Sequence, residues 1–328
     1  MATVYNRMML LAEKPLLTAA AGAMCIASSG VLVRLAATTP VTVAVYRCLY
    51  ALPFLGVIAF VERGRFQALP LKARRLAWVA GAFFALDLIF WHNAIAAVGA
   101  GLATVLGNLQ VLVVGFAAWA LLSEKPHRGL LVALPVVLIG VVLISGVIGE
   151  DAYGDNPTLG VVYGIATSLA YAAFILVLRH GSHDLRRVAG PLFHATLVSA
   201  LVALAYGIVS GRMQWNPGWP GQGWLVLLAL TAQVMGWLLI SRSLPRLPAA
   251  VTSVVLLLQP VGAIVLAAAL LRERPNAAQL LGAGLILAGV VGSTASYKRK
   301  ARAPQFDPVS EAILEDAGDN RVRTNKRP

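Results

Sequence analysis

The sequence contains little charge, and acidic residues are especially scarce. Only 12% of the 328 residues are charged, with 14 Asp or Glu against 27 Lys or Arg. A soluble domain carries roughly twice that charged fraction, so an ordinary soluble globular protein is excluded. The resulting net charge of +13 does not favour nucleic-acid binding, because the basic residues fall in short connecting segments and in the tail.

Cysteine is nearly absent as well. Cys25 and Cys48 both lie within apolar stretches, which is typical of small buried hydrophobic side chains and argues against a disulfide or metal pair. The sequence also lacks a metal-ligand cluster, a nucleotide-binding loop and a recognisable catalytic Ser-His-Asp or Cys-His arrangement. We therefore expect no enzyme activity, no cofactor and no metal site.

Long apolar runs dominate the chain, in which 59% of the residues are hydrophobic. A bilayer core of about 30 Å needs about 20 apolar residues per helix, with every backbone group hydrogen-bonded inside the segment. We therefore predict an all-α membrane protein with ten transmembrane helices, in which turns at Gly99–Gly101 and Pro245–Pro248 separate the closest pairs. The predicted spans are Pro15–Leu35, Pro40–Val61, Arg75–Val98, Gly101–Leu122, Gly129–Ile148, Thr158–Leu178, Val188–Ser210, Gln222–Ser243, Pro248–Leu271 and Ala277–Tyr297.

Lys and Arg are distributed unequally between the two sides predicted for the membrane. With the N-terminus inside, most of them fall on the cytoplasmic side, and the opposite side holds only Arg34, Arg212, Arg272 and Arg274. Basic residues favour the cytoplasmic side of membrane proteins. We thus predict a multi-pass protein of the bacterial inner (plasma) membrane with both termini in the cytoplasm.

A segment of the first half recurs in the second. An offset of 149 positions places Gln110 on Gln259 and Glu124–Pro126 (Glu-Lys-Pro) on Glu273–Pro275 (Glu-Arg-Pro). Each half holds five predicted spans, and because five is odd the second half enters the membrane in the opposite sense. Inverted repeats are typical of secondary transporters with a midplane site between the halves, and a stable scaffold is the alternative. The predicted parts are a cytoplasmic N-terminus (1–14), two five-helix repeats (15–148 and 158–297) and a disordered basic cytoplasmic tail (298–328).

The doubled Glu-(Lys/Arg)-Pro element, which closes the fourth predicted span of each half, resembles the EamA type of the drug/metabolite transporter superfamily. The resemblance extends over about residues 15–297 and includes Gln259-Pro260, whereas Gln110 is followed by Val111. It implies a basket-like bundle, monomeric or homodimeric, that exports amino acids or other small metabolites. Among the branches of the family, the chain is similar to the YddG-like aromatic amino-acid exporters.

Asp87 is the only acidic residue near the middle of a predicted span, and Trp91 follows it on the same helical face. Arg47 in the second span lies at a comparable depth, within about 3 Å along the membrane normal. Ionisable groups at bilayer depth are costly and usually face a cavity or a partner. A buried Arg47–Asp87 pair would either fix the packing or carry a proton or substrate, and the remaining alternative is that the two never meet.

Other polar and aromatic residues inside the predicted spans are candidates for substrate binding. His92 lies about 140° from Asp87 around the helix, so the two cannot share a face, but its ring could bind a carboxylate or relay a proton. Asn108, Gln110 and Gln259 either join helices by hydrogen bonds or face a cavity, and the repeat favours a cavity position for the two glutamines. Trp91, Tyr171 and Trp237 lie deep enough to line such a cavity, and His194, near the repeat counterpart of Arg47, is a weaker candidate.

Together these features predict a secondary transporter that exports small metabolites, with aromatic or large neutral amino acids as the expected class, by alternating access around a midplane cavity. Proton exchange through Asp87 and uncoupled facilitated diffusion are both open. The alternatives are a transporter for carboxylates or nucleotide-sugar-like solutes, and a membrane scaffold or lipid-handling enzyme. The expected partners are a small-molecule substrate and membrane lipid, without nucleic acid.

Overall fold

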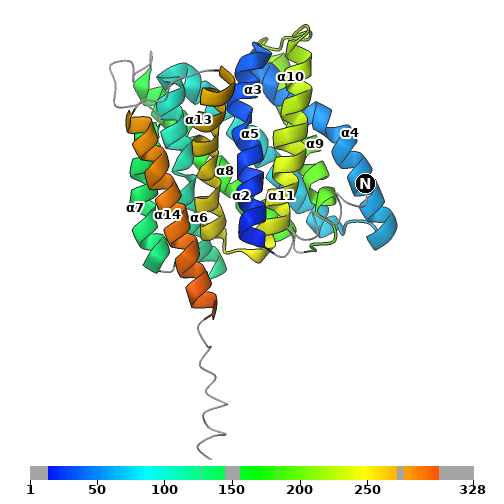
Figure 1. The fold of residues 1–328 in the computed structure, drawn as a ribbon. Coiled ribbons are helices and arrows are strands. Elements are labelled where there is room, and N and C mark those ends of the chain that lie inside the picture. Colours follow the sequence, from blue (N-terminus) through cyan, green and yellow to red (C-terminus); the bar gives the residue numbers. More distant parts are fainter. Residues whose placement is uncertain (1–13, 127, 145–155, 183, 272–276, 303–328) are drawn as a thin grey trace, which may run out of the picture.

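The computed structural model describes residues 14–126, 128–144, 156–182, 184–271 and 277–302, and over these ranges it contains helices and no strand. Figure 1 shows these helices standing side by side in a bundle, with their axes roughly aligned. A helix satisfies its backbone hydrogen bonds within its own segment, which is the requirement that a lipid environment imposes. The all-α prediction is therefore confirmed for the described residues.

The first half of the chain builds the helices up to the gap before residue 156. The short α3 continues the direction of α2 after a turn at Ser28. The helices of this half are α2 (Pro15–Ala27), α3 (Ser29–Ala36), α4 (Pro40–Phe66), α5 (Leu71–Asn108), α6 (Gln110–Leu122) and α7 (Arg128–Ile144).

The second half repeats this order with one internal irregularity. Between α10 and α11, residues Ala229–Gly236 form a π-helical stretch, and a 3-10 turn (Leu244–Arg246) follows α11. The helices of this half are α8 (Pro157–Gly181), α9 (Ala189–Val209), α10 (Gly221–Leu228), α11 (Trp237–Ser243), α12 (Ala249–Leu256), α13 (Leu258–Leu271) and α14 (Ala277–Arg302).

Within the described residues, six helical segments are long and apolar enough to cross a membrane by length and composition, and three shorter apolar helices accompany them. The prediction of many membrane-length apolar helices is confirmed, whereas the count of ten spans stays a prediction. The six long segments are Pro15–Ala36, Pro40–Phe66, Thr158–Gly181, Ala189–Val209, Gly221–Arg246 and Ala249–Leu270, and the three shorter helices are Leu106–Leu122, Arg128–Leu143 and Leu280–Ser293.

The connection between the third and fourth predicted spans differs from the predicted open turn. Helical backbone hydrogen bonding continues through Gly99–Gly101, so the predicted helix break there is wrong, and α5 ends only at Asn108. The chain nevertheless reverses its direction within α5. The evidence is that a Cβ placed on Gly107 would lie only 3.8 Å from Cδ1 of Trp91. Sixteen residues of straight helix would separate these positions by about 24 Å. The reversal thus lies between Trp91 and Gly107, within backbone that keeps helical hydrogen bonding.

Helices of the two halves pack against each other throughout the bundle. The most extensive contacts join α5 with α8, α7 with α14, and α4 with α9, and α2 packs on α11 and the π-helical stretch. Close approach depends on glycine at two of these contacts: a Cβ on Gly22 would lie 2.8 Å from the carbonyl oxygen of Gly236, and one on Gly140 would lie 2.7 Å from that of Gly282. Small residues allow such tight helix packing in membranes. The interface between the halves therefore runs through the middle of the bundle.

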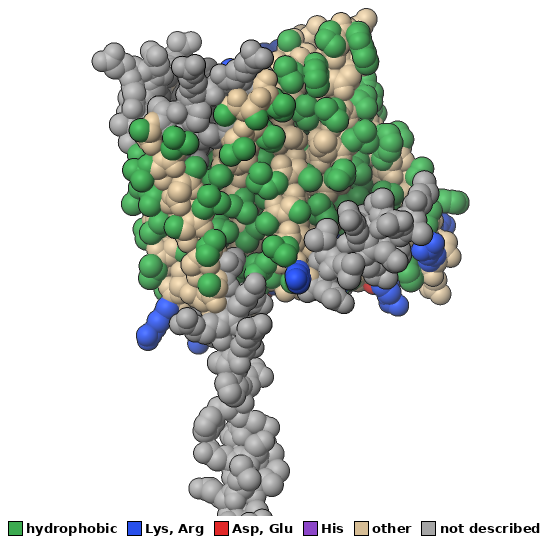
Figure 2. Space-filling model, in the orientation of Figure 1, with side chains coloured by type: hydrophobic (Ala, Val, Ile, Leu, Met, Phe, Trp, Pro, Cys, Tyr) green, Lys and Arg blue, Asp and Glu red, His purple; other side chains and the backbone are tan. Residues whose placement is uncertain are grey.

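The outer surface is apolar along the sides of the bundle. Figure 2 shows hydrophobic side chains covering the visible side wall, and Lys and Arg side chains at its lower edge. Large apolar residues point outward, such as Phe60 at 77% exposed and Val132 at 70%. An apolar surface of this extent marks a contact with lipid or another protein, and helices of membrane length along this wall fit a bilayer.

Candidate functional site

A cluster of polar and aromatic side chains lies in the interior, where helices of both halves meet. We call it the central cluster, and its members come from helices of both halves. The members are Arg47 of α4, Phe84 and Asp87 of α5, Tyr171 and Phe174 of α8, Gln233 of the π-helical stretch, Trp237 of α11 and Gln259 of α13.

Arg47 is held in place by an amide from the second half. Its side chain is 9% exposed, and its Nε donates a hydrogen bond to Oε1 of Gln233 at 2.9 Å. Gln233 in turn donates from Nε2 to Oγ1 of Thr196 at 3.1 Å. The guanidinium carbon also lies 5.5 Å from the ring centroid of Phe84, within the range of a cation–π contact. These contacts fix the guanidinium, and among the described residues no hydrogen bond engages its two terminal nitrogens.

Asp87 lies in the same buried region, also 9% exposed. Its charge and that of Arg47 interact through space, yet within the described ranges no hydrogen bond or ion pair joins the two side chains. The Arg47–Asp87 ion pair, one of the alternatives expected from the sequence, is therefore not among the ion pairs of the described residues. A buried carboxylate without a partner costs several kcal/mol, so its retention points to a ligand or a proton.

Four aromatic rings pack together beside the two charged groups. Phe84 and Phe174 are stacked at 4.6 Å, and Trp237 meets Phe174 edge-on at 4.7 Å. Tyr171 lies 6.2 Å from Trp237. Trp237 is 1% exposed, and its Nε1 has no hydrogen-bond partner among the described residues. The aromatic block thus presents both apolar area and a free donor at the level of the charges.

The two repeat-related glutamines have different surroundings. Gln259 donates from Nε2 to the hydroxyl of Tyr171 at 3.4 Å, which places it in the central cluster. Gln110 is 2% exposed, and its Oε1 lacks a hydrogen-bond partner in the part of the chain that the structure describes. The repeat relation therefore does not give the two amides equal roles in this conformation.

A helix interruption precedes each of these glutamines. Leu109 separates α5 from α6 directly before Gln110, and Leu257 separates α12 from α13 two residues before Gln259. Only the second interruption has a nearby proline, Pro260, so proline is not the common cause. Discontinuous helices are typical of transporter binding sites because they expose backbone groups at bilayer depth.

The remaining predicted residues occupy several places. Trp91 is half-buried on α5 beside Gly107, and Asn108 is half-buried at the end of the same helix. His92 is part of α5, but its side chain lies outside the described residues. His194 contacts Trp78 edge-on at 6.3 Å near one end of the bundle, apart from the central cluster.

Sequence reasoning missed three members of the central cluster, Phe84, Phe174 and Gln233. Gln233 lies four positions before Trp237, and Phe84 lies three positions before Asp87, so both share a helical face with a predicted residue. That spacing was the available signal. No pattern indicated the π-helical stretch around Gln233, a feature that is frequent at functional sites.

The Glu-Lys-Pro element has a structural role at one end of the bundle. Oε2 of Glu124 accepts a hydrogen bond from the backbone N–H of Ala249 at 2.9 Å, at the start of α12. Its Oε1 pairs with Nη2 of Arg179 at 2.6 Å, and Nε of Arg179 donates to the carbonyl of Leu244 at 3.0 Å. A carboxylate at a helix N-terminus satisfies free N–H groups and opposes the helix dipole. The repeat counterpart, Glu273, lies outside the described residues.

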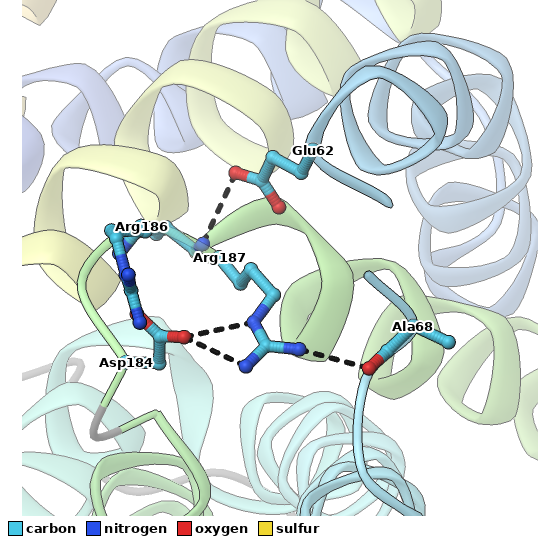
Figure 3. A network of polar contacts seen from close by, with 6 residues as sticks. Glu62, Ala68, Asp184, Arg186 and Arg187 are labelled. Carbon is cyan, nitrogen blue, oxygen red and sulfur yellow. Dashed lines mark hydrogen bonds and ion pairs between the residues drawn. The ribbon is translucent and has the colours of Figure 1, made fainter. Parts of the chain in front are cut away.

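Figure 3 shows a second cap of this kind, in which Glu62 reaches the start of α9. Its carboxylate accepts hydrogen bonds from the N–H groups of Val188, Ala189 and Gly190 at 3.0 to 3.1 Å. Next to it, Asp184 pairs with Arg187 at 2.8 Å, and Arg187 donates to the carbonyl of Ala68. We call the Glu124 and Glu62 contacts the end caps. In both end caps a carboxylate of the first half accepts hydrogen bonds from groups of the second half, so each carboxylate has partners inside the protein.

A cavity of about 590 Å³ lies between α4, α5, α9 and the segment 211–214. Asn93 donates from Nδ2 to the hydroxyl of Tyr206 on its wall at 3.2 Å. No member of the central cluster lines it. Its position near the loop that holds Arg212, on the side predicted to be extracytoplasmic, makes it a separate hollow at one end of the bundle.

Comparison with known proteins matches both halves of the chain to one family model, the EamA-like transporter family, over residues 13–146 and 158–295. A solved structure described as "Crystal structure of protein" superposes with a TM-score of 0.74 at 16% sequence identity, covering 88% of this chain and 98% of that chain. At this identity the likeness shows the fold alone. No curated protein matches the sequence.

Proposed function

Because the chain belongs to the EamA-like transporter family, and is thus a multi-pass membrane transporter of small solutes, we propose that it exports aromatic or large neutral amino acids. The observation that carries this proposal is the central cluster, in which a buried cation and a buried anion are held near each other without pairing. An amino-acid zwitterion supplies one carboxylate for Arg47 and one ammonium for Asp87. Such a ligand would replace the water that both charges lose on burial.

The aromatic block gives the proposed site its preference among amino acids. Phe84, Tyr171, Phe174 and Trp237 offer apolar and aromatic area directly beside the charges. Small-molecule sites are mostly apolar and use few polar groups to orient the ligand. An aromatic or large aliphatic side chain fits this surface, whereas a charged side chain would lose its hydration without a partner.

The arrangement of the repeats supports alternating access as the mechanism. The central cluster takes members from α4 and α5 of one half and from α8, α11 and α13 of the other, so a relative rotation of the halves would change its exposure to each side. The interrupted helices before Gln110 and Gln259 provide places where such a motion can bend the backbone. Asp87 is the candidate for carrying a proton in the opposite direction, because it has no fixed counterion.

The proposed setting is the bacterial inner membrane, with both termini in the cytoplasm and ten spans in two inverted halves. The unequal distribution of Lys and Arg supports this orientation. We propose a monomer or homodimer as the working unit.

Counterflow in proteoliposomes tests the substrate class. Vesicles loaded with unlabelled phenylalanine should accumulate labelled phenylalanine, tyrosine, tryptophan and leucine in a saturable way, whereas lysine and glutamate should not compete. Arg47→Gln should strongly reduce this flux, and the matched control Arg65→Gln, at an exposed position of the same helix, should retain it. Flux of organic acids or sugar phosphates without amino-acid flux would instead support the carboxylate or nucleotide-sugar class and refute the amino-acid proposal.

A further inference from the structure

A second cavity, of about 270 Å³, lies at the end of the bundle where α4 ends and where α5 and α9 begin. We call it the basic cavity. Three arginines line it, Arg63, Arg74 and Arg187, together with His194. It is distinct from the central cluster, which lies deeper along the same helices.

Some of the charged side chains around the basic cavity have partners inside the protein, and others lack a carboxylate partner among the described residues. Arg187 is occupied by Asp184 and the carbonyl of Ala68, and Glu62 is occupied by the start of α9. By contrast, no described carboxylate lies within 4 Å of Arg63 or Arg74. The cavity therefore has a surplus of positive charge that its own acidic residues do not neutralise.

Two buried nitrogen atoms at the basic cavity also lack partners. Nε of Arg74 and Nδ1 of His194 are inaccessible and make no hydrogen bond within the described ranges. The guanidinium of Arg74 lies over the ring of Trp78 at 5.3 Å, which holds it at the cavity wall. Buried polar atoms without partners are uncommon in folded proteins and indicate an absent ligand or water.

The other wall of the basic cavity is apolar and continues toward the outer surface of the bundle. Gly56, Ala59, Phe60 and Phe193 line it, and Phe60 is largely exposed on the apolar side wall. Trp78, which is also partly exposed, is the type of residue found at the headgroup level of a membrane. From the arginines to Phe60, the cavity thus changes from cationic to apolar in the order of a phospholipid headgroup and its acyl chain.

We propose that the basic cavity is a binding site for an anionic phospholipid, with the phosphate held by Arg63 and Arg74 and the acyl chains along Gly56 and Phe60. Arginine suits phosphate oxygens through paired N–H donors. The orientation predicted from the Lys and Arg distribution places this end in the cytoplasmic leaflet, where basic pockets between helices bind anionic headgroups. A bound lipid at this position would join α4, α5 and α9 at one end.

Native mass spectrometry of the purified full-length protein tests the proposal with two lipids of identical acyl chains, phosphatidylglycerol and phosphatidylcholine. We expect phosphatidylglycerol to bind more tightly. Because one basic residue near an anionic surface contributes about a fivefold change in affinity, Arg74→Gln and Arg63→Gln should each weaken binding about fivefold, and the double variant about 25-fold. Arg63 is exposed, so its variant carries the test if the Arg74 variant fails to fold.

Matched controls separate a specific site from general charge attraction. Arg75→Gln and Arg65→Gln remove the same charge from neighbouring exposed positions that do not line the cavity, and they should leave the affinity within about twofold. Equal losses in controls and cavity variants, or no preference for phosphatidylglycerol, would overturn the proposal. Displacement of the bound lipid by an excess of inorganic phosphate would assign the cavity to a free anion instead and overturn the lipid assignment.

Discussion

The end caps and the central cluster both contain buried or half-buried acidic and basic side chains, but they use their charges in opposite ways. Glu124 is bonded to Arg179 and to the N–H of Ala249, so its carboxylate is satisfied inside the protein. Asp87 is more deeply buried and has no such bond among the described residues. On the function proposed above, the end caps hold the halves in place, whereas the central cluster keeps its charges for a ligand.

Amide substitutions of Asp87 and Arg47, the two charged residues of the central cluster, should have the largest effect on this contrast. Asp87→Asn and Arg47→Gln should each reduce amino-acid flux by roughly 10- to 150-fold, the equivalent of one charge-assisted hydrogen bond. Asp87→Asn should not lower the free energy of unfolding, because it removes a buried charge that has no partner among the described residues. Arg47→Gln should lower it only slightly, through loss of the hydrogen bond to Gln233. Counterflow rates and thermal unfolding in detergent measure the two effects on the same samples.

The opposite pattern is expected at the end cap. Glu124→Gln should lower the free energy of unfolding by about 1–3 kcal/mol, since Arg179 and the start of α12 lose a charged acceptor. Its flux per folded molecule should remain close to that of the wild type. A double-mutant cycle with Arg179→Gln measures how much of the loss belongs to the pair. A large loss of flux in a stable Glu124→Gln protein would contradict the division between the two regions.

A smaller effect is expected at Asp184, beside the other end cap. Burial acts to raise the pKa of this carboxyl, but hydrogen bonds from Arg186 and Arg187 outweigh it and hold the pKa below its ordinary value. A lowered pKa stabilises the folded state above the ordinary value of about 3.9, and the benefit is lost as pH falls through the folded pKa. The stability difference between wild type and Asp184→Asn should therefore be present near pH 6 and shrink below about pH 4. A difference that is constant with pH would show that charge is not its source.

The sequence was sufficient to predict the parts of the fold that depend on single segments. Apolar length located the long helices, and the Pro residues at the starts of α2, α4 and α8 coincide with their first turns. The duplicated Glu-basic-Pro element located the two halves, which the family match over residues 13–146 and 158–295 supports. The bent helical backbone between Trp91 and Gly107 was not predictable, because glycines permit a reversal without specifying its hydrogen bonds.

For the central cluster, the sequence indicated how deep each residue lies in the membrane, but not toward which neighbouring helix its side chain points. Arg47 and Asp87 were expected at one level and occur in one buried region, yet their rotation about the helix axes is set by contacts among several helices. The partner of Arg47, Gln233, lies within the π-helical stretch, whose position the sequence did not indicate. The neighbours of Gln110 and Gln259 were likewise not predictable. The two residues occupy equivalent positions in the repeat, but Gln259 bonds to Tyr171 whereas Oε1 of Gln110 has no hydrogen-bond partner among the described residues.

Competition by charge-deleted analogues tests the central claim most directly, namely that Arg47 and Asp87 bind the two charges of one zwitterion. With labelled phenylalanine as substrate, 3-phenylpropionate lacks the ammonium and phenylethylamine lacks the carboxylate. The account predicts that both analogues compete poorly with wild type, that Asp87→Asn discriminates less against 3-phenylpropionate, and that Arg47→Gln discriminates less against phenylethylamine. Equal competition by the zwitterion and both analogues in the wild type, or unchanged discrimination in both variants, would contradict it.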